Sequence, residues 1–375
     1  MKTRLKSQII EAAHRLGFPL AGVTTPDPPA GMQRYESWLA AGYHGDMDYL
    51  ASERARNRRA DPGLILPDCR SILMLATPYY PASLLAQEEL QIAAYALGRD
   101  YHYTLVERMN LLADTIAALT GKPFAGKVYT DTGPLLEREL AHRAGLGWIG
   151  RNSCLIHPQY GSHLLLSEIL LDLDLEPDAP FEKDLCGTCQ RCLQACPTAC
   201  ILDNRTLDAT RCISYLTIES RGPIPEELRE AIGERFFGCD TCQDVCPWNQ
   251  HSNASSDDPA FQPSARLLSS SLVDFITLDP QRWRAPYKES PLLRAKRRGL
   301  ARNACVVAGN RRDAGLLPAL ETALRSDPDP LVRQHAAWAM GRIGGKAARC
   351  ALKKAAGCEN NADVQAAIQH ASRMN

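Results

Sequence analysis

The chain has 375 residues, 45% of them hydrophobic and 23% charged, which is enough length for two or three domains and enough apolar side chain to build their cores. This composition excludes a disordered or fibrous protein, and no apolar run reaches the roughly 18 residues that cross a bilayer. Charges balance at 43 Lys+Arg against 43 Asp+Glu, but residues 281–375 carry 18 basic and 7 acidic side chains, which indicates an anionic partner at that end. Because Glu11, His14 and Arg15 interrupt the first 20 residues, these lack the apolar segment of a secretion signal, and we expect a cytoplasmic protein.

Residues 1–175 alternate the patterns of helices and strands. Apolar runs at 71–77 and 162–171 predict strands buried on both faces, and 127–130 predicts a shorter strand. A helix is expected to start near Pro134 and to run to Ala144. Another helix carries an apolar stripe at steps of four and three residues, formed by Leu105, Met109, Leu112, Ile116 and Leu119. This interleaving predicts an α/β layered domain with central strands and outer helices.

The last hundred residues repeat with a period of 32. Gly309 and Gly341 are 32 residues apart, and so are Val332 and Val364, in units that are apolar on one helical face. Such a period predicts helix pairs stacked as a HEAT-like array, with residues 327–330 (DPDP) as the turn between units.

Nine of the 14 cysteines lie between Cys186 and Cys246, and such crowding without a secretion signal indicates metal or redox chemistry before disulfides. The first four follow the x2-x2-x3 spacing before proline that is typical of bacterial ferredoxins. In that pattern three close thiolates hold one 4Fe–4S cubane and the fourth cysteine reaches the other cubane.

The second run, Cys239-x2-Cys242-x3-Cys246-Pro247, is one ligand short, because Phe236 stands where its first cysteine would be. Cys212 is available upstream. Cluster one is then predicted to bind Cys186, Cys189, Cys192 and Cys246, and cluster two Cys196, Cys212, Cys239 and Cys242. Cys200 falls outside both patterns and is expected to be a plain buried thiol. A pair of structural zinc sites is the alternative, but zinc binding does not require the x2-x2-x3 spacing followed by proline.

We therefore predict a multidomain α+β protein in three parts. The α/β domain covers 1–175, and a ferredoxin-like module with two clusters covers 176–258, after a boundary at 176–180 (EPDAP). The polar stretch 251–259 is expected to be an exposed connector, and all-α HEAT-like repeats with their connector cover 259–375.

Two further motifs are incomplete. Residues 145–150 (GLGWIG) match G-x-G-x-x-G, but a helical pattern precedes them and an extended segment follows, the reverse of a dinucleotide site. A glycine-rich helix exit that lets a flat ligand approach the backbone remains open. Asp100-Tyr-His102 starts like the Asp-x-His-x-x-Gly motif of cobalamin enzymes with a histidine on cobalt, but Leu105 replaces the glycine. The cluster 99–103 (RDYHY) either lines a pocket or starts a solvated helix.

Asp131 follows the strand predicted over 127–130 and precedes Gly133 and Pro134. Layered α/β domains place their sites at the carboxyl ends of strands, where a buried carboxyl group with a raised pKa acts as a general acid. The alternative is a helix N-cap, because Asp before a proline-initiated helix caps it well.

A basic run opens the repeat region, with no acidic residue between positions 291 and 312. Such a run is often only a solvated helix face, but in a segment of net charge +11 it favours phosphate contacts. These contacts would position a nucleic acid and would not read its bases. The candidates are Arg294, Lys296, Arg297 and Arg298, and the run continues with Arg302, Arg311 and Arg312.

With these motifs in place, the chain resembles the epoxyqueuosine reductases, cobalamin-dependent iron–sulfur enzymes of queuosine formation in tRNA. The similarity covers nearly the whole length, and the order of its blocks is more specific than any one block. Besides the cysteine runs, the blocks are 47–50 (MDYL), 98–102 (GRDYH), 128–135 (VYTDTGPL), 144–152 (AGLGWIGRN) and 290–299 (SPLLRAKRRG).

The resemblance implies a cobalamin-binding N-terminal domain similar to that of reductive dehalogenases and the B12-trafficking chaperone. It implies an oxidoreductase that reduces epoxyqueuosine to queuosine at the wobble position of tRNA, by two-electron epoxide deoxygenation through cob(I)alamin fed by two 4Fe–4S clusters. The HEAT-like end would hold the tRNA, whose single-stranded anticodon loop presents its base at little cost. An external low-potential electron donor and a monomeric state are expected.

The resemblance also carries over by position. Asp131 matches the proton donor proposed for the family, which would protonate the oxygen that leaves the opened epoxide. Arg151 stands where lysine is frequent, and the match is loosest over 52–59. Corrinoid contacts are expected at Asn152, His157, Ser214, Ser220 and Asp240, with Arg138 and His102 as weaker candidates.

Two other functions stay open at this point. A corrinoid reductase acting on small molecules, like the reductive dehalogenases, fits the clusters, but such enzymes usually carry an export signal and have no reason for a basic repeat array. A nucleic-acid-binding protein with structural or redox-sensing clusters and no catalysis is the other.

Overall fold

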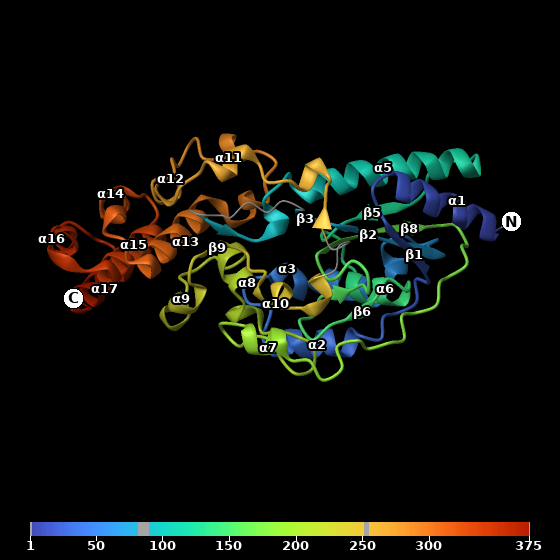
Figure 1. Cartoon of the computed structure of the whole chain (residues 1–375), viewed down its shortest axis with the longest axis horizontal. Coiled ribbons are helices and arrows are strands. Elements are labelled where there is room, and N and C mark those ends of the chain that lie inside the picture. The colour runs from blue at the N-terminus through green and yellow to red at the C-terminus, as the bar shows by residue number, and fades with distance from the viewer. Residues whose placement is uncertain (1, 82–89, 251–254, 375) are drawn as a thin grey trace. The chain divides into compact units, whose positions relative to one another are not determined.

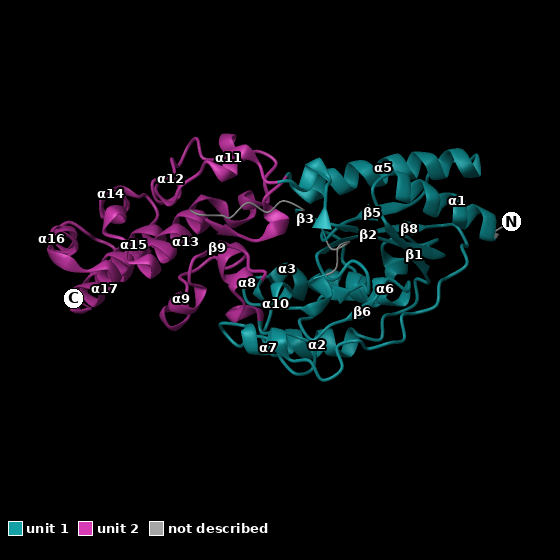
Figure 2. Cartoon of the chain, in the orientation of Figure 1, with its two compact units in different colours: residues 1–83, 99–208, 241–262 teal, residues 84–98, 209–240, 263–375 magenta. Residues whose placement is uncertain are grey.

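The computed structural model describes residues 2–81, 90–250 and 255–374, and Figure 1 shows their elements in chain order. They form two compact units (Figure 2): residues 1–83, 99–208 and 241–262 make up unit 1, and residues 84–98, 209–240 and 263–375 make up unit 2. The cysteine-rich segment contributes to both units. Residues 251–254 of the expected connector lie outside the described residues.

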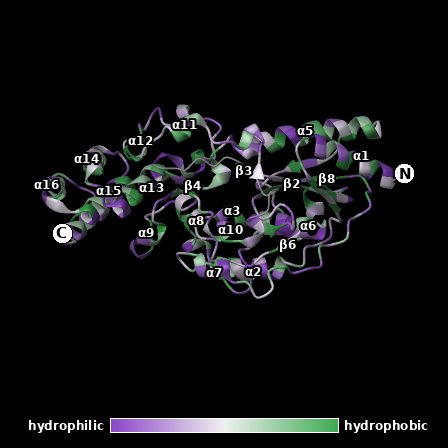
Figure 3. Cartoon of the chain, viewed as in Figure 1, coloured by the Kyte–Doolittle hydropathy of each residue, from purple (hydrophilic) through white to green (hydrophobic). Residues whose placement is uncertain are grey.

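An antiparallel sheet in the order β1-β2-β8-β5 forms the centre of unit 1. Every residue of β2 is buried, and β2 pairs with β8 from Ser71↔Leu171 to Pro78↔Leu164, so the apolar run has a neighbouring strand on both edges. Figure 3 shows mostly hydrophobic residues on both strands. The three strands predicted from the sequence are confirmed, with bounds β2 (Ser71–Pro78), β5 (Lys127–Tyr129) and β8 (Leu164–Leu171). The fourth strand, β1 (Leu20–Thr24), was not predicted. Because the sheet is antiparallel, the rule that places sites at the carboxyl ends of parallel strands does not apply to it.

Helices and short strand pairs surround this sheet. The predicted stripe lies on α5 (Tyr101–Thr120), which buries Leu105, Met109, Leu112 and Ile116, whereas Leu119 is exposed. The other helices of unit 1 are α1 (Lys2–Arg15), α2 (Met32–Ala40), α3 (Asp48–Ala51), α4 (Glu53–Ala60), α6 (Glu137–Arg143), α7 (Arg191–Ala195) and α10 (Thr241–Asp244). The short strands β6 (Trp148–Ile149) and β7 (Leu155–Ile156) pair antiparallel, and β3 (Tyr80–Pro81) pairs parallel with β10 (Ser255–Ser256). None of the helices in the described part of the chain combines the length and the apolar character that crossing a bilayer requires.

Unit 2 contains the predicted helical repeats. Its strands β4 (Gln91–Ile92) and β9 (Arg235–Phe237) pair parallel. Its helices are α8 (Ile213–Ile218), α9 (Glu226–Ile232), α11 (Ala265–Leu268), α12 (Leu272–Ile276), α13 (Lys296–Arg311), α14 (Leu317–Ser326), α15 (Pro330–Ile343), α16 (Gly345–Ala356) and α17 (Ala362–Arg373).

Two close helix contacts reproduce the 32-residue period. A Cβ atom on Gly309 of α13 would lie 3.0 Å from the Cα atom of Ala339 in α15, and one on Gly341 of α15 would lie 2.8 Å from the Cα atom of Ala371 in α17. Glycine is required at both positions because the neighbouring backbone occupies the space of a side chain. The repeat therefore records a contact that recurs between successive long helices.

The segment 209–240 is tied to α13 by buried polar side chains. Arg302 is 0% exposed and donates to the carbonyl oxygens of Leu216, Ser220 and Gly222 at 2.5–2.9 Å. Asn303 Nδ2 donates to the carbonyl oxygens of Thr217 and Phe236. Since a buried guanidinium needs several acceptors, this arrangement makes Arg302 a structural residue and removes it from the exposed basic run.

Candidate functional site

Asp131 lies in the loop after β5, with its backbone in the left-handed region at φ 58°. Neighbouring contacts must hold a non-glycine residue there. Its N–H donates to Glu137 Oε1 at 2.8 Å, Tyr101 donates its hydroxyl to Asp131 Oδ2 at 2.8 Å, and His102 Nε2 lies 3.8 Å from that same oxygen. The Asp131 side chain is 67% exposed, so the carboxyl group is open to a substrate and lacks the burial that would raise its pKa.

The aromatic cluster 99–103 starts α5 and also faces Asp131. Asp100 caps the helix, because its Oδ1 accepts from the His102 N–H at 3.0 Å, and the same oxygen lies 2.7 Å from His102 Nδ1. The rings of Tyr101 and His102 stack with centroids 4.1 Å apart. The two interpretations of this cluster are therefore compatible: the helix start presents Tyr101 and His102 to the Asp131 carboxylate.

The alternative role of Asp131 as a helix cap is wrong. Helix α6 begins at Glu137 and its N-cap is Leu136, which makes no side-chain hydrogen bond. The first two residues of α6 instead anchor two loops, because Glu137 accepts from the Asp131 N–H and Arg138 donates to the carbonyl oxygen of Ser153. Asn152 belongs to the same turn as Ser153 and is therefore fixed relative to the Asp131 loop.

Asn152 and His157 present unused hydrogen-bond donors. Asn152 is 4% exposed, its Oδ1 accepts from the Cys154 N–H at 3.2 Å, and its Nδ2 has no partner among the described residues. His157 Nδ1 accepts from the backbone N–H groups of Gln159 and Tyr160 at 3.1 and 3.3 Å, which leaves Nε2 as the donor of a neutral ring. Burial lowers the pKa of His157 and favours that neutral form. The buried Asn152 donor, which has no acceptor among the described residues, calls for one from a bound group, and a corrinoid rich in amide oxygens fits it. The partly buried His157 ring adds a second donor.

The glycine-rich segment 145–150 serves the packing of the chain itself. A Cβ atom on Gly147 would lie 2.1 Å from the carbonyl oxygen of Ile156, and one on Gly145 would lie 2.9 Å from that of Ala179. Both glycines have positive φ, at 149° and 81°. The backbone that approaches these two glycines is the protein's own, and a flat ligand beside this segment stays a prediction.

Glu168 and Glu137 form a buried carboxyl pair that sequence reasoning missed. Glu168 is 0% exposed on β8, and neither carboxylate oxygen finds a hydrogen-bond donor within the described chain. Burial raises the pKa of Glu137 to about 8, with the Asp131 carboxylate adding to the effect, and burial raises the pKa of Glu168 well above its usual range. The sequence signal was a single carboxylate inside the apolar run LLLSEILL.

The four thiols expected for cluster one lie together in unit 1. Cys246 packs in an apolar group with Trp148, Ile156 and Cys186. Burial raises the pKa values of Cys192 and Cys246, and the nearby Cys186 thiol adds to both shifts. The Cys189 thiol also adds to the shift of Cys246. The structure thus brings Cys246 from the second run beside the cysteines of the first.

Aromatic residues enclose these thiols. Trp148 Nε1 donates to Cys186 Sγ at 3.4 Å, and the Trp148 ring packs edge-on against Trp248 and stacks on Phe181, with centroids 5.1 and 5.7 Å away. Such a shell limits water access and donates a hydrogen bond to a sulfur atom, and both effects set the potential of a bound cluster.

The remaining cysteines fall in both units. Cys196 Sγ lies 3.5 Å from Cys200 Sγ, and Cys200 is buried, as expected. Cys242 belongs to unit 1, whereas Cys212 and Cys239 belong to unit 2. Among the described residues, no three His, Cys, Asp or Glu side chains lie close enough together to hold one metal ion. The four thiolates of a 4Fe–4S cluster lie farther apart than the ligands of a single ion, because each binds a different iron.

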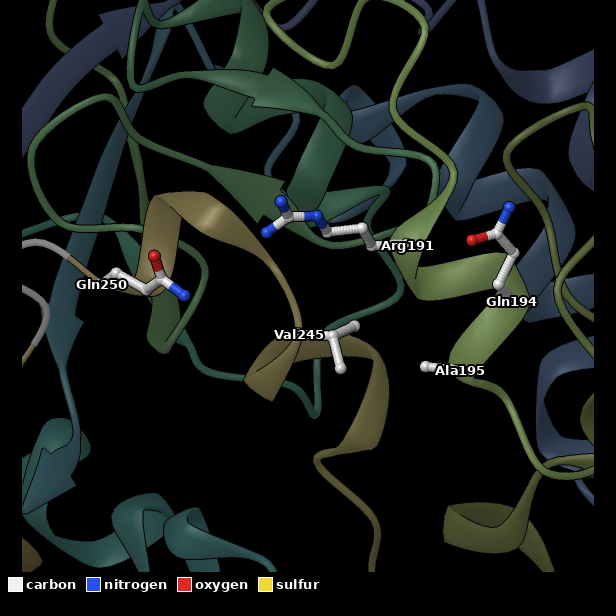
Figure 4. A pocket seen from close by; sticks show the side chains of 5 residues that line it. All are labelled: Arg191, Gln194, Ala195, Val245 and Gln250. Atoms are coloured by element: carbon white, nitrogen blue, oxygen red, sulfur yellow. The ribbon is translucent and has the colours of Figure 1, made fainter.

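An open hollow of about 470 Å³ lies beside the cysteine helices (Figure 4). Three of its lining residues, Arg191, Ala195 and Val245, directly precede predicted cluster ligands in the sequence. Gln194 and Gln250 complete the lining.

The expected residues of unit 2 have different surroundings. Ser214 lies on α8, Ser220 accepts from Arg302 through its carbonyl oxygen, and Asp240 Oδ2 accepts from the Ala94 N–H at 2.7 Å. In the basic run, Lys296 and Arg298 are exposed, and the partly exposed Arg294 side chain forms an ion pair with Glu219 at 2.7 Å.

Arg297 does not suit the phosphate contact that the sequence led us to expect. Its guanidinium donates to both carboxylate oxygens of Asp327 at 2.7 Å, and the two side chains are 10% and 7% exposed. Arg297 and Arg298 are neighbours on α13, and successive helical side chains point about 100° apart, so only Arg298 is directed to solvent.

Three family models match the chain: "Epoxyqueuosine reductase QueG, DUF1730" over residues 59–132, "4Fe-4S double cluster binding domain" over 185–249, and "HEAT repeats" over 291–373. The chain is 38% identical over 349 residues to the epoxyqueuosine reductase of Pseudomonas aeruginosa, covering 91% of this chain and 95% of that protein.

Solved structures agree over the whole length. A crystal structure of a selenomethionine-labelled epoxyqueuosine reductase superposes with a TM-score of 0.91 at 32% identity and covers 99% of each chain. A crystal structure of epoxyqueuosine reductase with an epoxyqueuosine-modified stem loop of tyrosine tRNA has a TM-score of 0.87 at 31% identity, covering 99% of this chain and 98% of that one.

Proposed function

This chain belongs to the epoxyqueuosine reductase family, and we propose from that premise that Asp131 is its proton donor in the reduction of epoxyqueuosine to queuosine in tRNA. The protein is an oxidoreductase that uses cobalamin and two 4Fe–4S clusters. The reaction takes up two electrons and two protons, and it converts the epoxide into an alkene and water. When bound, cobalamin supplies the low-potential centre that reduces the epoxide, and the clusters supply its electrons singly.

The observation that carries the role of Asp131 is its exposed carboxyl group on a conformationally fixed backbone. Tyr101 donates its hydroxyl hydrogen to this group and His102 Nε2 lies 3.8 Å from it, while Glu137 accepts the Asp131 N–H from the other side. A general acid must lie within hydrogen-bond reach of the oxygen that it protonates. An exposed carboxyl group, held by its neighbours and open to an incoming base, meets that requirement.

We propose that Asn152 and His157 bind cobalamin through the two donors that the protein leaves unused. His102 lies beside the same loop and is kept as a candidate. Arg138 is assigned a supporting role, because its guanidinium donates to the carbonyl oxygen of Ser153. Ser214, Ser220 and Asp240 stay predictions from the resemblance.

For cluster one we propose the ligands Cys186, Cys189, Cys192 and Cys246, supported by the mutual proximity of these thiols within unit 1. Cys196, Cys212, Cys239 and Cys242 stay the predicted ligands of cluster two. Cys200 is placed beside Cys196 as a neighbour and not as a ligand.

We propose that the anticodon stem-loop of tRNA binds the basic end of the repeat region, as residue type and exposure favour for Lys296 and Arg298. Arg294 joins them where phosphate displaces Glu219 from its ion pair. We keep the three predicted segments as functional parts: residues 1–175 for cobalamin chemistry, 176–258 for electron transfer and 259–375 for tRNA binding. We further propose an external low-potential donor and a monomer, in which large exposed apolar side chains such as Leu64, Leu111 and Val273 are scattered.

Asp131→Asn tests the proposal in protein reconstituted anaerobically with iron, sulfide and hydroxocobalamin. With a strong low-potential reductant and tRNA that carries epoxyqueuosine, nucleoside analysis should show queuosine formation reduced by about 10²–10⁴-fold, the range of one general acid. Iron and cobalt contents should equal those of the parent. Asp114→Asn, on the exposed side of α5, is the matched control and should keep full activity. An Asp131→Asn enzyme as fast as the parent would refute the assignment.

A further inference from the structure

The Asp131 loop lies on a carboxyl pair that the reaction as described does not use. Glu168 stands opposite Tyr129 in the pairing of β8 with β5 and opposite Met74 in the pairing with β2. A Cβ atom on Gly133 would lie 3.0 Å from Glu168 Oε1, so the loop backbone rests directly against this carboxyl group. Glu137 approaches the same place from α6 and lies within hydrogen-bond reach of Glu168.

We propose that Glu137 and Glu168 share one proton and that this pair holds the Asp131 loop in its reactive conformation, so that both are positioning residues for the proton donor. The inference rests on the proposed function of Asp131. Hydrogen bonds run from Glu168 to Glu137 and from Glu137 to the Asp131 N–H, and they link the buried sheet to the exposed acid.

A shared proton follows from the charges around the pair. Two carboxylates in contact cannot both stay ionised without a cation, and no ion pair to either is formed by the described residues. Among the described residues, Arg138 is the cation that acts on Glu137, and its guanidinium donates to the carbonyl oxygen of Ser153. Asp131 adds negative charge from the loop, β2 contributes the apolar Met74, and β5 contributes Tyr129.

The proton has a preferred place within the pair. None of the described residues donates to the Glu168 carboxyl group, so its protonated form donates to Glu137 and satisfies both buried groups. Glu137 then remains an acceptor for the Asp131 N–H, which keeps that residue at its positive φ. When the pair loses its proton, two negative charges lie beneath the loop and oppose the hydrogen-bonded arrangement.

The test combines single-turnover kinetics across pH with infrared spectroscopy of the holoenzyme. Glu168→Gln keeps a donor to Glu137 at every pH, so the parent's loss of activity above about pH 8, where the pair releases its shared proton, should disappear in this variant. Glu137→Ala removes the contact with the Asp131 N–H and should lower the rate by about 10²-fold, the scale of a misplaced catalytic group, with tRNA affinity unchanged. Glu137→Gln keeps an acceptor oxygen and should restore most of that rate.

The infrared difference spectrum reports the pair without any turnover. The parent minus Glu168→Gln spectrum at pH 7 should contain the carbonyl band of a protonated carboxylic acid, and the exposed control Glu11→Gln should not remove that band. Absence of the band, or a Glu168→Gln pH profile equal to that of the parent, overturns the inference. If Asp131→Asn is fully active while the band is present, the role of Asp131 fails and the buried pair stands. The two failures are therefore distinguishable.

Discussion

Arg297→Met is expected to destabilise the protein without weakening its attraction to RNA. Arg297 makes two 2.7 Å hydrogen bonds to Asp327 and a third, at 3.3 Å, to the carbonyl oxygen of Leu278. Removal of the guanidinium leaves the buried Asp327 carboxylate without its ion-pair partner, which costs about 3–5 kcal/mol. At about 1.4 kcal/mol per factor of ten, the unfolding equilibrium constant should rise roughly 10²–10⁴-fold.

Two measurements separate this structural role from a phosphate contact. Urea denaturation of the anaerobic protein should give Arg297→Met a lower midpoint, and Arg298→Met a midpoint equal to that of the parent. Titration of tRNA at several salt concentrations should show an unchanged salt slope for Arg297→Met and a slope smaller by about 0.7–0.9 for Arg298→Met. Adding Asp327→Leu to Arg297→Met should recover most of the lost stability, since an apolar pair often replaces a buried ion pair at little cost. The reasoning is refuted if Arg297→Met is as stable as the parent and loses one phosphate contact.

Three further changes address the site. Trp148→Phe removes the N–H donor to Cys186 Sγ and should move the midpoint potential of cluster one to a more negative value in an EPR redox titration, because that bond stabilises the reduced cluster; an unchanged potential speaks against the contact. Because burial raises the pKa of Glu137 to about 8 from an ordinary 4.5, the folded chain keeps a proton that the unfolded chain releases, and stability should fall between about pH 5 and 8 by up to about 1.4 kcal/mol per pH unit. Glu137→Gln should flatten that decline in urea midpoints, and an equally steep decline would contradict it. Asn152→Ala should retain less cobalamin after desalting, at unchanged iron content, whereas the exposed control Asn360→Ala should retain as much as the parent.

Local sequence pattern was sufficient for the central strands and the repeats. β2 and β8 are the central strands of the sheet and are buried along nearly their whole length, and burial on both faces produces a continuous apolar run. The 32-residue period is recognisable in the sequence because Gly309 and Gly341 each lie against the backbone of the next long helix, where a side chain has no room. The relative direction of the paired strands could not be predicted, because burial alone produces the same apolar run in parallel and antiparallel sheets.

Site residues could be predicted where their spacing along the sequence is typical of a cofactor, and could not where they meet only through tertiary packing. The crossed use of Cys246 follows from ferredoxin spacing, whereas the Glu137–Glu168 pair joins a helix and a strand that no local pattern connects. Charge counting treated Arg297 and Arg298 alike, although helix geometry turns one toward Asp327 and the other toward solvent. Reading the basic run by helix face would have separated them.

Helix α6 explains how a short element positions a reaction site. Four of its seven residues carry charged side chains that hold loops, and its apolar residues Leu140 and Ala141 are buried. Since successive side chains on a helix point about 100° apart, neighbouring charged residues reach different loops. Glu137, Arg138, Glu139 and Arg143 contact, in that order, the N–H of Asp131, the carbonyl oxygen of Ser153, the N–H of Gly31 and the carbonyl oxygen of Thr25. The placement of the proton donor therefore depends on how α6 packs against the sheet, and a loss of packing at Leu140 is transmitted to Asp131 through Glu137 even though Leu140 contacts neither substrate nor cofactor.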